Sequence, residues 1–142
     1  MRDERGGTLV ELVAVLAILA VGIGLVTPSL GSALAGLRAH GATADLYGAV
    51  HLTKSYARTT GRTHGLVLEP DGRAFRIVEV ASGQTVLGPS PLADGAVATS
   101  NVTIRFSSRG FAVPSGTITV RSEDETRRLI VNILGRVRVV RG

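Results

Sequence analysis

The chain has 142 residues, a formal net charge of +5 and no cysteine, which excludes disulfide bonds and cysteine-ligated metal sites. Aromatic residues make up only 4% of the sequence, so the core of a folded domain has to consist of aliphatic side chains. Arginine supplies nearly all of the basic excess, which suits an acidic partner or surface as well as ordinary solubility.

An apolar segment dominates the N-terminal part of the chain. Residues 12–37 include no charged side chain, which is long enough for a helix to cross the roughly 30 Å apolar core of a bilayer. Glu11 lies directly before this run. An isolated carboxylate in a membrane helix costs on the order of a few kcal/mol, so we expect Glu11 to be functional and to have a partner.

Two general interpretations of this N-terminus are a signal peptide and a simple anchor. A secretory signal peptide would combine the charged residues 1–5, an apolar region at 12–26 and a small-residue cleavage site at 33–35. Against it, the leading segment has no net charge and Glu11 abuts the apolar region. A simple membrane anchor with a cytoplasmic N-terminus accounts for the apolar run, but it leaves Glu11 unexplained.

A third interpretation rests on a motif. Gly6 is followed by Gly7, Thr8, Leu9, Val10 and Glu11, and then by the long apolar run. This arrangement resembles the leader and N-terminus of type IV prepilins and type II secretion pseudopilins. The resemblance implies that a prepilin peptidase cuts between Gly6 and Gly7 and that Gly7 is N-methylated. The family usually has phenylalanine or another large apolar residue where this chain has Gly7.

Cleavage at this point would give Glu11 a partner. The new amino group on Gly7 would lie about 6 Å of helix from Glu11. In a filament of staggered helices, the carboxylate of one subunit can pair with the amine of its neighbour, and a missing partner leaves a costly buried charge. Glu11 is therefore predicted to set the register of subunit assembly. The alternative is a carboxylate near the cytoplasmic face that reaches the aqueous phase.

One helix is predicted from about Thr8 to Thr59, with Gly61 as its stop. Pro28 removes a helix hydrogen bond and is predicted to kink or loosen it, and pilin-like proteins commonly carry a proline at this depth. Apolar residues at helical spacing should pack this helix on a globular head. The predicted buried stripe consists of Leu30, Leu34, Leu37, Leu46, Val50 and Ala57.

Short β runs replace the helical pattern from Gly65 onward. Residues 66–68 and 75–80 flank the turn signal Pro-Asp-Gly at 70–72 and so predict a hairpin. A loop rich in glycine, serine and proline follows at 81–94, with a short strand at 85–87. Further strands are predicted at 102–106, 117–121, 129–133 and 137–140, of which the last two form a hairpin.

These elements predict an α+β fold, in which a long N-terminal transmembrane helix packs against an antiparallel β-sheet head. The expected parts are a leader at 1–6, a transmembrane and filament-core segment at 7–29, the second half of the helix at 30–61, and the head at 62–142. The prepilin resemblance implies the same pilin-like architecture.

The second half of the chain is similar to the GspH and FimT group of pilin-like proteins. In that group a helix ending in an Ala-Arg pair leads into a strand, as Ala57 and Arg58 do here. Residues 104–110 and 130–138 resemble the group's Phe-x-x-x-Gly segment and its terminal Gly-Arg-x-Arg hairpin. The resemblance implies a minor pseudopilin or minor pilin, a structural component of a type II secretion pseudopilus or a type IV pilus, which initiates the filament or lies at its tip.

No pattern of residues indicates an enzyme, a cofactor or a metal site. His40 and His51 lie about three helical turns apart, too far to chelate one ion, and we expect both, with His64, on the surface. The acidic residues 123–125 offer oxygen ligands of the kind that calcium prefers, but the arginines that follow favour a charged turn between two strands. No serine or glycine pattern matches a nucleophile elbow or a phosphate-binding loop.

The C-terminal arginines support an alternative function. Arg136 and Arg138 are two residues apart, which places them on one face of the predicted strand, with Arg141 just beyond. Residues 121–141 contain six arginines against three acids, a local charge of +3. In the FimT branch the Gly-Arg-x-Arg hairpin is linked to DNA binding in natural transformation, so a DNA-binding minor pilin is the alternative. An edge strand that carries charge against aggregation also explains these residues.

The expected partners follow from the resemblance. They are other pilins or pseudopilins in a filament, the prepilin peptidase and the inner membrane, with duplex DNA added in the alternative and no small-molecule substrate in either case. The expected location is the bacterial inner membrane, crossed once, with a cytoplasmic N-terminus and a periplasmic head, and after processing the assembled filament.

Overall fold

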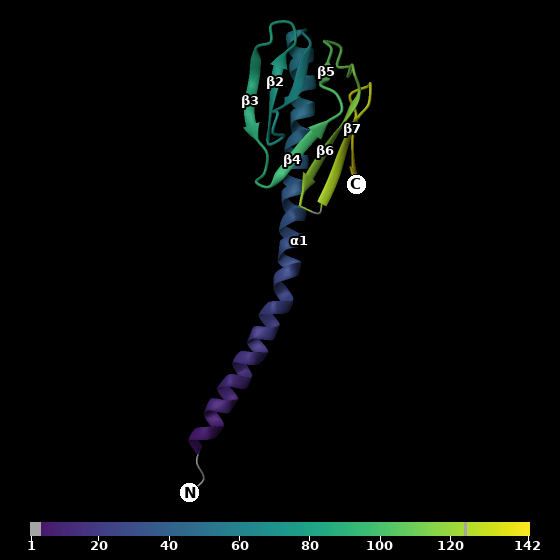
Figure 1. Cartoon of the computed structure of the whole chain (residues 1–142). Helices are drawn as coiled ribbons and strands as arrows, with labels where there is room; N and C mark the ends of the chain where they lie inside the picture. The colour runs from purple at the N-terminus through teal and green to yellow at the C-terminus, as the bar shows by residue number, and fades with distance from the viewer. Residues whose placement is uncertain (1–3, 124) are drawn as a thin grey trace. The chain divides into compact units, whose positions relative to one another are not determined.

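The structure is a computed structural model that describes the backbone of residues 4–123 and 125–142, and the side chains of 9–22, 33–123 and 125–142. The chain divides into two compact units, Met1–Leu34 and Ala35–Gly142. One helix, α1 (Glu4–Thr60), continues from the first unit into the second (Figure 1). The second unit, which we call the head, contains the end of α1 and the strands.

The predicted helix is confirmed, and its end has a clear cause. α1 has 57 residues and stops at Thr60. Gly61 follows with a φ of +69°, a left-handed conformation that glycine adopts without steric strain and that commonly ends helices. The predicted stop at Gly61 is therefore correct.

Small side chains line the face of α1 that packs inside the head. The buried helix positions recur at intervals of three and four residues, as expected of a helix with one buried face. They are Ala35, Ala39, Ala42, Thr43, Leu46, Ala49, Val50, Thr53 and Ala57. The hydroxyl groups of Thr43 and Thr53 donate to the carbonyl oxygens of Ala39 and Ala49, so that burial leaves neither unpaired.

The predicted stripe is only partly correct. Leu46, Val50 and Ala57 are buried as expected, but Leu34 and Leu37 are 49% and 67% exposed, and Leu30 lies outside the residues with described side chains. Close approach of the sheets to the helix needs small residues, and alanine meets this requirement where leucine would not. The larger residues of this stretch therefore face outward.

Within the described residues, eight strands form two antiparallel four-stranded sheets. The first sheet has the order β3-β2-β1-β5 and the second β4-β6-β7-β8. The strands of the first sheet are β1 (His64–Leu68), β2 (Ala74–Glu79), β3 (Thr85–Pro91) and β5 (Ile104–Phe106). Those of the second are β4 (Ala96–Ser100), β6 (Gly116–Ser122), β7 (Glu125–Val131) and β8 (Val137–Arg141).

The predicted antiparallel head is confirmed, with several differences in its strands. The hairpins β1–β2 and β7–β8 form as predicted. β3 is longer than expected and ends at Pro91, β7 begins four residues before the predicted strand, and β4 was not predicted. β4 has the sequence Ala-Val-Ala-Thr-Ser, and its small and polar residues give little strand signal.

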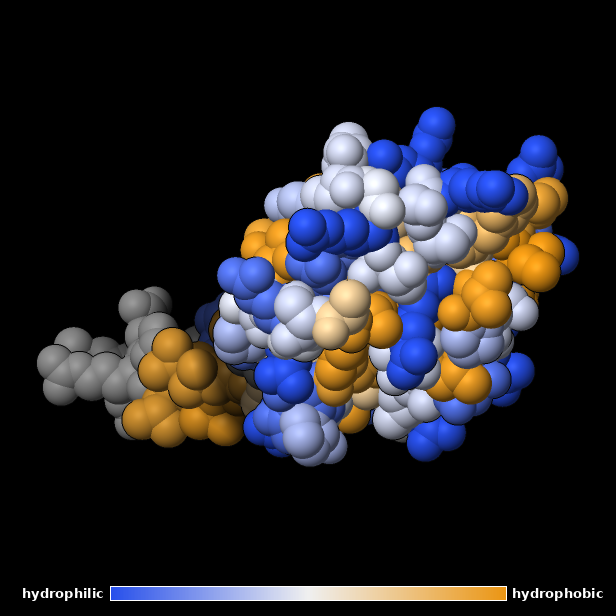
Figure 2. All heavy atoms as spheres, turned by 90° about the horizontal axis from the view of Figure 1, so that it is seen from above, coloured by the Kyte–Doolittle hydropathy of each residue, from blue (hydrophilic) through white to orange (hydrophobic). Residues whose placement is uncertain are grey.

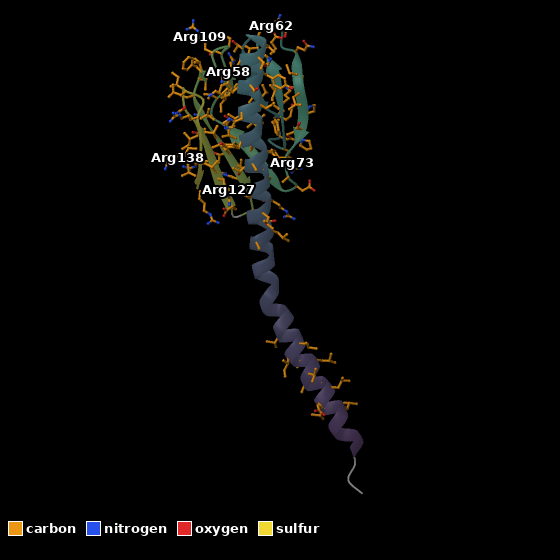
Figure 3. All side chains as sticks on the ribbon, turned by 180° about the vertical axis from the view of Figure 1, so that it is seen from behind. Arg58, Arg62, Arg73, Arg109, Arg127 and Arg138 are labelled. Atoms are coloured by element: carbon orange, nitrogen blue, oxygen red, sulfur yellow. The ribbon has the colours of Figure 1, made fainter. Side chains whose placement is uncertain are left out.

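A shared core lies between α1 and both sheets. Figures 1 and 3 view the head from opposite sides, and in both α1 runs along one face of the two sheets. In β2, β5 and β6 buried residues alternate with more exposed ones, as expected of strands with one face against a core. The largest apolar side chains from the sheets that are fully buried are Ile77, Ile104, Phe106, Ile118, Val120, Leu129 and Val131.

The outer edge of the first sheet is formed by β3. Its pairing with β2 is irregular, with register shifts between Phe75 and Val78. β3 includes Pro89 and Pro91, which have no amide N–H to offer a further strand. This edge therefore presents an incomplete set of main-chain donors.

Candidate functional site

An exposed apolar surface covers the described part of the first unit. Every side chain from residue 9 to residue 22 is exposed, and the large apolar ones have exposed fractions between 49% and 72%. They are Leu9, Val10, Leu12, Val13, Val15, Leu16, Ile18, Leu19 and Val21. A continuous apolar surface of this kind indicates an interaction site.

Glu11 lies within this surface. It is exposed, and no described residue forms an ion pair with it. Gly6 and Gly7, the predicted cleavage residues, and Pro28 lie outside the residues with described side chains. Among the described residues, no helix combines the length and hydropathy needed to cross a membrane.

The three C-terminal arginines do not lie together. β8 begins at Val137, so Arg136 belongs to the preceding turn and not to the strand as predicted; its backbone N–H donates to Oδ1 of Asn132 at 2.9 Å. Arg138 pairs with Ile130 in register and is exposed. Arg141, three residues further along the strand, faces the opposite side of the sheet.

Arg141 belongs to an ion-pair network centred on Glu125. The Nε atom of Arg141 is 2.9 Å from Oε1 of Glu125, and a second nitrogen is 3.3 Å from Oε2. Arg127 is 3.3 Å from the same carboxylate and 3.2 Å from Nδ1 of His40. The hydrogen bond from Arg141, aided by the charges of Arg141 and Arg127, lowers the pKa of Glu125, although desolvation opposes the shift. The same hydrogen bond raises the pKa of Arg141.

A second group of arginines shares the outer face of the second sheet. Arg128 pairs with Thr119 on one side and with Val140 on the other, so Arg121 and Arg138 lie diagonally across from it on the same face. All three are exposed, and none forms an ion pair with a described carboxylate. Sequence spacing did not indicate this group, because Arg121 and Arg128 reach the face from β6 and β7 and lie beside Arg138 only through strand pairing.

The histidines and acidic residues are dispersed. His40 and His51 are exposed as predicted, but the expectation for His64 is wrong: it is 2% exposed, stacks on Tyr56 at 6.0 Å between ring centroids and lies 3.1 Å from the carbonyl oxygen of Arg62. Among the described residues, which exclude Asp124, no group of histidine and acidic side chains could hold a metal ion. Glu123 pairs with Arg38 at 3.1 Å.

An N-terminal helix with an exposed apolar segment, continuing into a head in which it packs on antiparallel strands, defines the pilin-like class of proteins. The sequence carries the prokaryotic N-terminal methylation motif at residues 1–27. Residues 42–135 match the family model of the type II transport protein GspH, which covers most of the head. The chain belongs to the GspH family, whose members are structural pilins and pseudopilins that assemble with other pilins in filaments.

Solved structures of minor pilins and pseudopilins have the same fold. The type IV minor pilin FimU of Pseudomonas aeruginosa is 21% identical, with a TM-score of 0.60 over 71% of this chain and 87% of FimU. The minor pseudopilin EpsH from the type 2 secretion system of Vibrio cholerae is 17% identical, with a TM-score of 0.56 over 75% of this chain and 96% of EpsH. No curated protein sequence matches the chain. The predicted family and fold are thus confirmed.

Proposed function

We propose that this chain is cut between Gly6 and Gly7, anchored in the inner membrane by residues 7–29, and assembled as a minor subunit of a short filament with its head outside the cytoplasm. The observation that carries the proposal is the exposed apolar surface of residues 9–22 together with Glu11. Such a surface indicates that a bilayer or other subunits cover it. The methylation motif at residues 1–27 supports this use.

Glu11 is proposed to position the subunit in the filament. After cleavage, the amine on Gly7 and the carboxylate of Glu11 carry opposite charges about one helical turn apart. When neighbouring helices stagger, each carboxylate meets the amine of the next subunit in an environment with little solvent screening. Only one axial offset between neighbouring helices pairs the Glu11 carboxylate with the Gly7 amine. Any other offset leaves a buried charge unpaired.

Replacement of Glu11 tests this role. We expect Glu11→Ala and Glu11→Gln to leave the chain in the membrane fraction and the head folded, but to reduce its recovery in sheared filaments by at least about tenfold, the change that about 1.4 kcal/mol produces. Asp45→Ala is the matched control, because Asp45 is an exposed carboxylate of α1 within the head. Normal incorporation of both Glu11 variants would contradict the proposed role.

Mass spectrometry of the membrane-extracted protein tests the processing. We expect the loss of residues 1–6 and one added methyl group on Gly7. Gly7→Phe, which restores the residue type usual in the family, should be processed at least as completely. An intact N-terminus, or cleavage after Ala35 as in a secretory signal peptide, would exclude the proposed maturation.

The proposed place of the subunit is the start or the tip of the filament. Both structural relatives described above are minor subunits, and a subunit needed in few copies acts most effectively where assembly begins. Deletion of the gene should therefore lower the number of filaments per cell while leaving their mean length nearly unchanged. Shorter filaments in normal number would point to a position along the shaft.

Duplex DNA binding is a second candidate function, and the outer face of the second sheet favours it. Arg121, Arg128 and Arg138 are exposed there without a described carboxylate partner. Guanidinium groups bind phosphate oxygens without requiring a particular base sequence. Arg141 is already engaged by Glu125.

A mobility-shift titration of duplex DNA with the fragment of residues 35–142 tests this candidate. Binding should weaken with salt, and Arg128→Ala and Arg138→Ala should each lower the slope of log K against log salt by about 0.9, the value for one lost phosphate contact. Arg141→Ala should change the slope little, because that side chain is paired. No shift at low salt would exclude the candidate.

A further inference from the structure

A mixed apolar and cationic surface covers the end of the head where α1 terminates. Figure 2 views the molecule from this end and shows separate apolar groups between hydrophilic side chains. We call it the apical surface. Its apolar members are Val80, Phe111, Val113, Ile133 and Leu134, with exposed fractions of 36%, 42%, 59%, 59% and 50%. Its cationic members are Arg58, Arg62, Arg105, Arg109 and Arg136, all exposed.

Two loops carry most of the apolar members and are bonded to each other. The N–H of Ala112 donates to the carbonyl oxygen of Ile133 at 2.9 Å. Ala112 itself is fully buried, so its neighbours Phe111 and Val113 are turned outward. The apical surface is therefore held in place by main-chain hydrogen bonds and a buried side chain.

The tip of the β7–β8 hairpin has an unusual composition. Asn132 and Arg136 close a three-residue loop through a backbone hydrogen bond of 3.0 Å, and Gly135 takes the positive φ of +68° that such loops require. The two remaining loop positions are Ile133 and Leu134. Turns normally use Gly, Pro, Asn, Asp or Ser at such positions, so two large exposed apolar residues here point to contact with an apolar phase.

Arginines surround these apolar side chains, and few nearby carboxylates neutralise their positive charge. Arg62 pairs with Glu79 at 3.0 Å, and Glu79 is the one described carboxylate that pairs with any of the five apical arginines. Five arginines and one glutamate give the surface a charge of +4. Arg58, Arg62 and Arg109 lie at this end of the head in Figure 3.

A hollow of about 620 Å³ adjoins the loop that carries Val113 and has a similar lining of apolar and cationic side chains. Val80, Val113 and Arg105 are among the residues that line it. The side chains of Val80 and Arg105 both lie over Gly65, where an added Cβ would be 3.6 Å from each. Val80 and Val113 thus border the same shallow depression as Arg62 and Arg105, and Glu79, the one carboxylate among its lining residues, is paired with Arg62. An acyl chain and its phosphate could enter this depression together.

We propose that the apical surface docks on an anionic phospholipid membrane. Apolar side chains on loop tips can enter the boundary between headgroups and acyl chains, while the surrounding arginines contact phosphate groups. A nucleic acid backbone would use the arginines but not the apolar tips. A second copy of the chain is disfavoured, because at the opposite end of the head Arg38, Arg127 and Arg141 are paired with acidic residues and leave no comparable negative surface among the described residues.

A vesicle-tethering experiment tests the proposal with the full chain. The protein is reconstituted into phosphatidylcholine vesicles, so that its N-terminal helix is already covered, and fluorescent acceptor vesicles with or without phosphatidylglycerol are added. We expect tethering of the anionic acceptors only. Arg109→Glu should weaken it by at least about fivefold, the change that about 1 kcal/mol per cation near an anionic surface produces.

The apolar contribution is tested separately. Phe111→Ser and Ile133→Ser should each reduce tethering of anionic acceptors about fivefold or more, the loss expected when a large apolar side chain no longer leaves water. Val139→Ser and Arg73→Glu are the matched controls, since Val139 is 42% exposed on β8 and Arg73 lies at the opposite end of the head (Figure 3). Both controls should tether like the unaltered protein.

A fluorescence measurement keeps the test independent of variant stability. The sequence has no tryptophan, so Phe111→Trp and Val139→Trp each introduce a unique probe. Brominated lipids in the acceptor vesicles should quench the first and not the second. Equal tethering of neutral and anionic acceptors, or the absence of quenching at position 111, would overturn the proposal. Loss of tethering in Arg109→Glu without any effect of Phe111→Ser and Ile133→Ser would also overturn it, in favour of a polyanion such as nucleic acid or an acidic protein.

Discussion

Lys54 of α1 donates a hydrogen bond of 3.0 Å from Nζ to the carbonyl oxygen of Leu134, in the turn between β7 and β8. The carbonyl oxygen of Gly135 is 3.4 Å from the same nitrogen. The sole lysine of the chain thus fastens the last hairpin to the helix. The fragment of residues 35–142 encloses one core, so this contact and others within the head can be tested in that fragment.

Lys54→Met should destabilise the head by about 1 kcal/mol, because a hydrogen bond from a charged donor is lost while the aliphatic stem is retained. Urea unfolding monitored by circular dichroism measures the change. Arg128→Met is the control, since Arg128 is exposed without a described side-chain hydrogen bond, and it should stay within about 0.5 kcal/mol of the unaltered protein. Equal stability of the two variants would show that the Lys54 contact contributes nothing.

Gly135→Ala should destabilise the head by about 1–3 kcal/mol. Gly135 has a φ of +68°, and an added Cβ would lie 2.9 Å from the ring of Phe106 and 3.0 Å from the carbonyl oxygen of Gly110. Gly48→Ala provides a control of opposite sign: nothing lies within 4 Å of its added Cβ, so the better helix former should stabilise by up to about 1 kcal/mol. The melting temperatures of the two variants should therefore move in opposite directions.

Enlarging Ala42 (Ala42→Leu) should lower the stability of the head more than truncating Leu37 (Leu37→Ala), although loss of a leucine side chain is usually the more costly change. Ala42 is fully buried under the sheets, so extra methylene groups should cost about 1–3 kcal/mol through overpacking. Leu37 is 67% exposed, so its truncation should change the free energy of unfolding of the fragment by no more than about 0.5 kcal/mol. A large loss on Leu37→Ala would mean that this leucine is buried in the head after all.

The ion pairs of Glu125 should make stability depend on pH. The pKa of Glu125 is lowered on folding from its ordinary value of about 4.5, so its contribution is fully present above that pH and is lost as the pH falls through the lowered folded value. Glu125→Gln should therefore be less stable than the unaltered fragment at pH 7, and the two should converge below about pH 4.5. A difference that persisted unchanged at pH 3 would assign the effect to packing and not to charge.

Strong local signals made much of this fold predictable. Gly61 ends the helix where its position indicated, and the turn at residues 70–72 joins β1 to β2 as expected. β4 was not predicted because its small and polar residues give little strand signal. Its strand depends on pairing with β6 and on the hydrogen bond from the N–H of Ala98 to the carbonyl oxygen of Gly72. The division of the strands into two sheets likewise depends on long-range pairing that no local pattern encodes.

The candidate sites were predictable to a different extent. Glu11 stood out because a charge interrupts an apolar pattern, and its proposed role depends on other subunits. The surroundings of the arginines were not predictable from sequence, since counting charges along residues 121–141 could not reveal that Glu125 engages Arg141 or that Arg121 and Arg128 lie on the same face as Arg138. Partners brought together by strand register decide which cations remain available.

The prolines of β3 have a consequence for how subunits recognise one another. Pro89 and Pro91 deny an incoming strand two main-chain donors at the border of the first sheet. A head with a complete edge strand could bind neighbouring heads by strand addition. Such binding would not depend on the order of the subunits or on contact between their N-terminal helices. Because these two donors are missing, strand addition at this edge is disfavoured, and recognition of the next subunit there depends more on side chains.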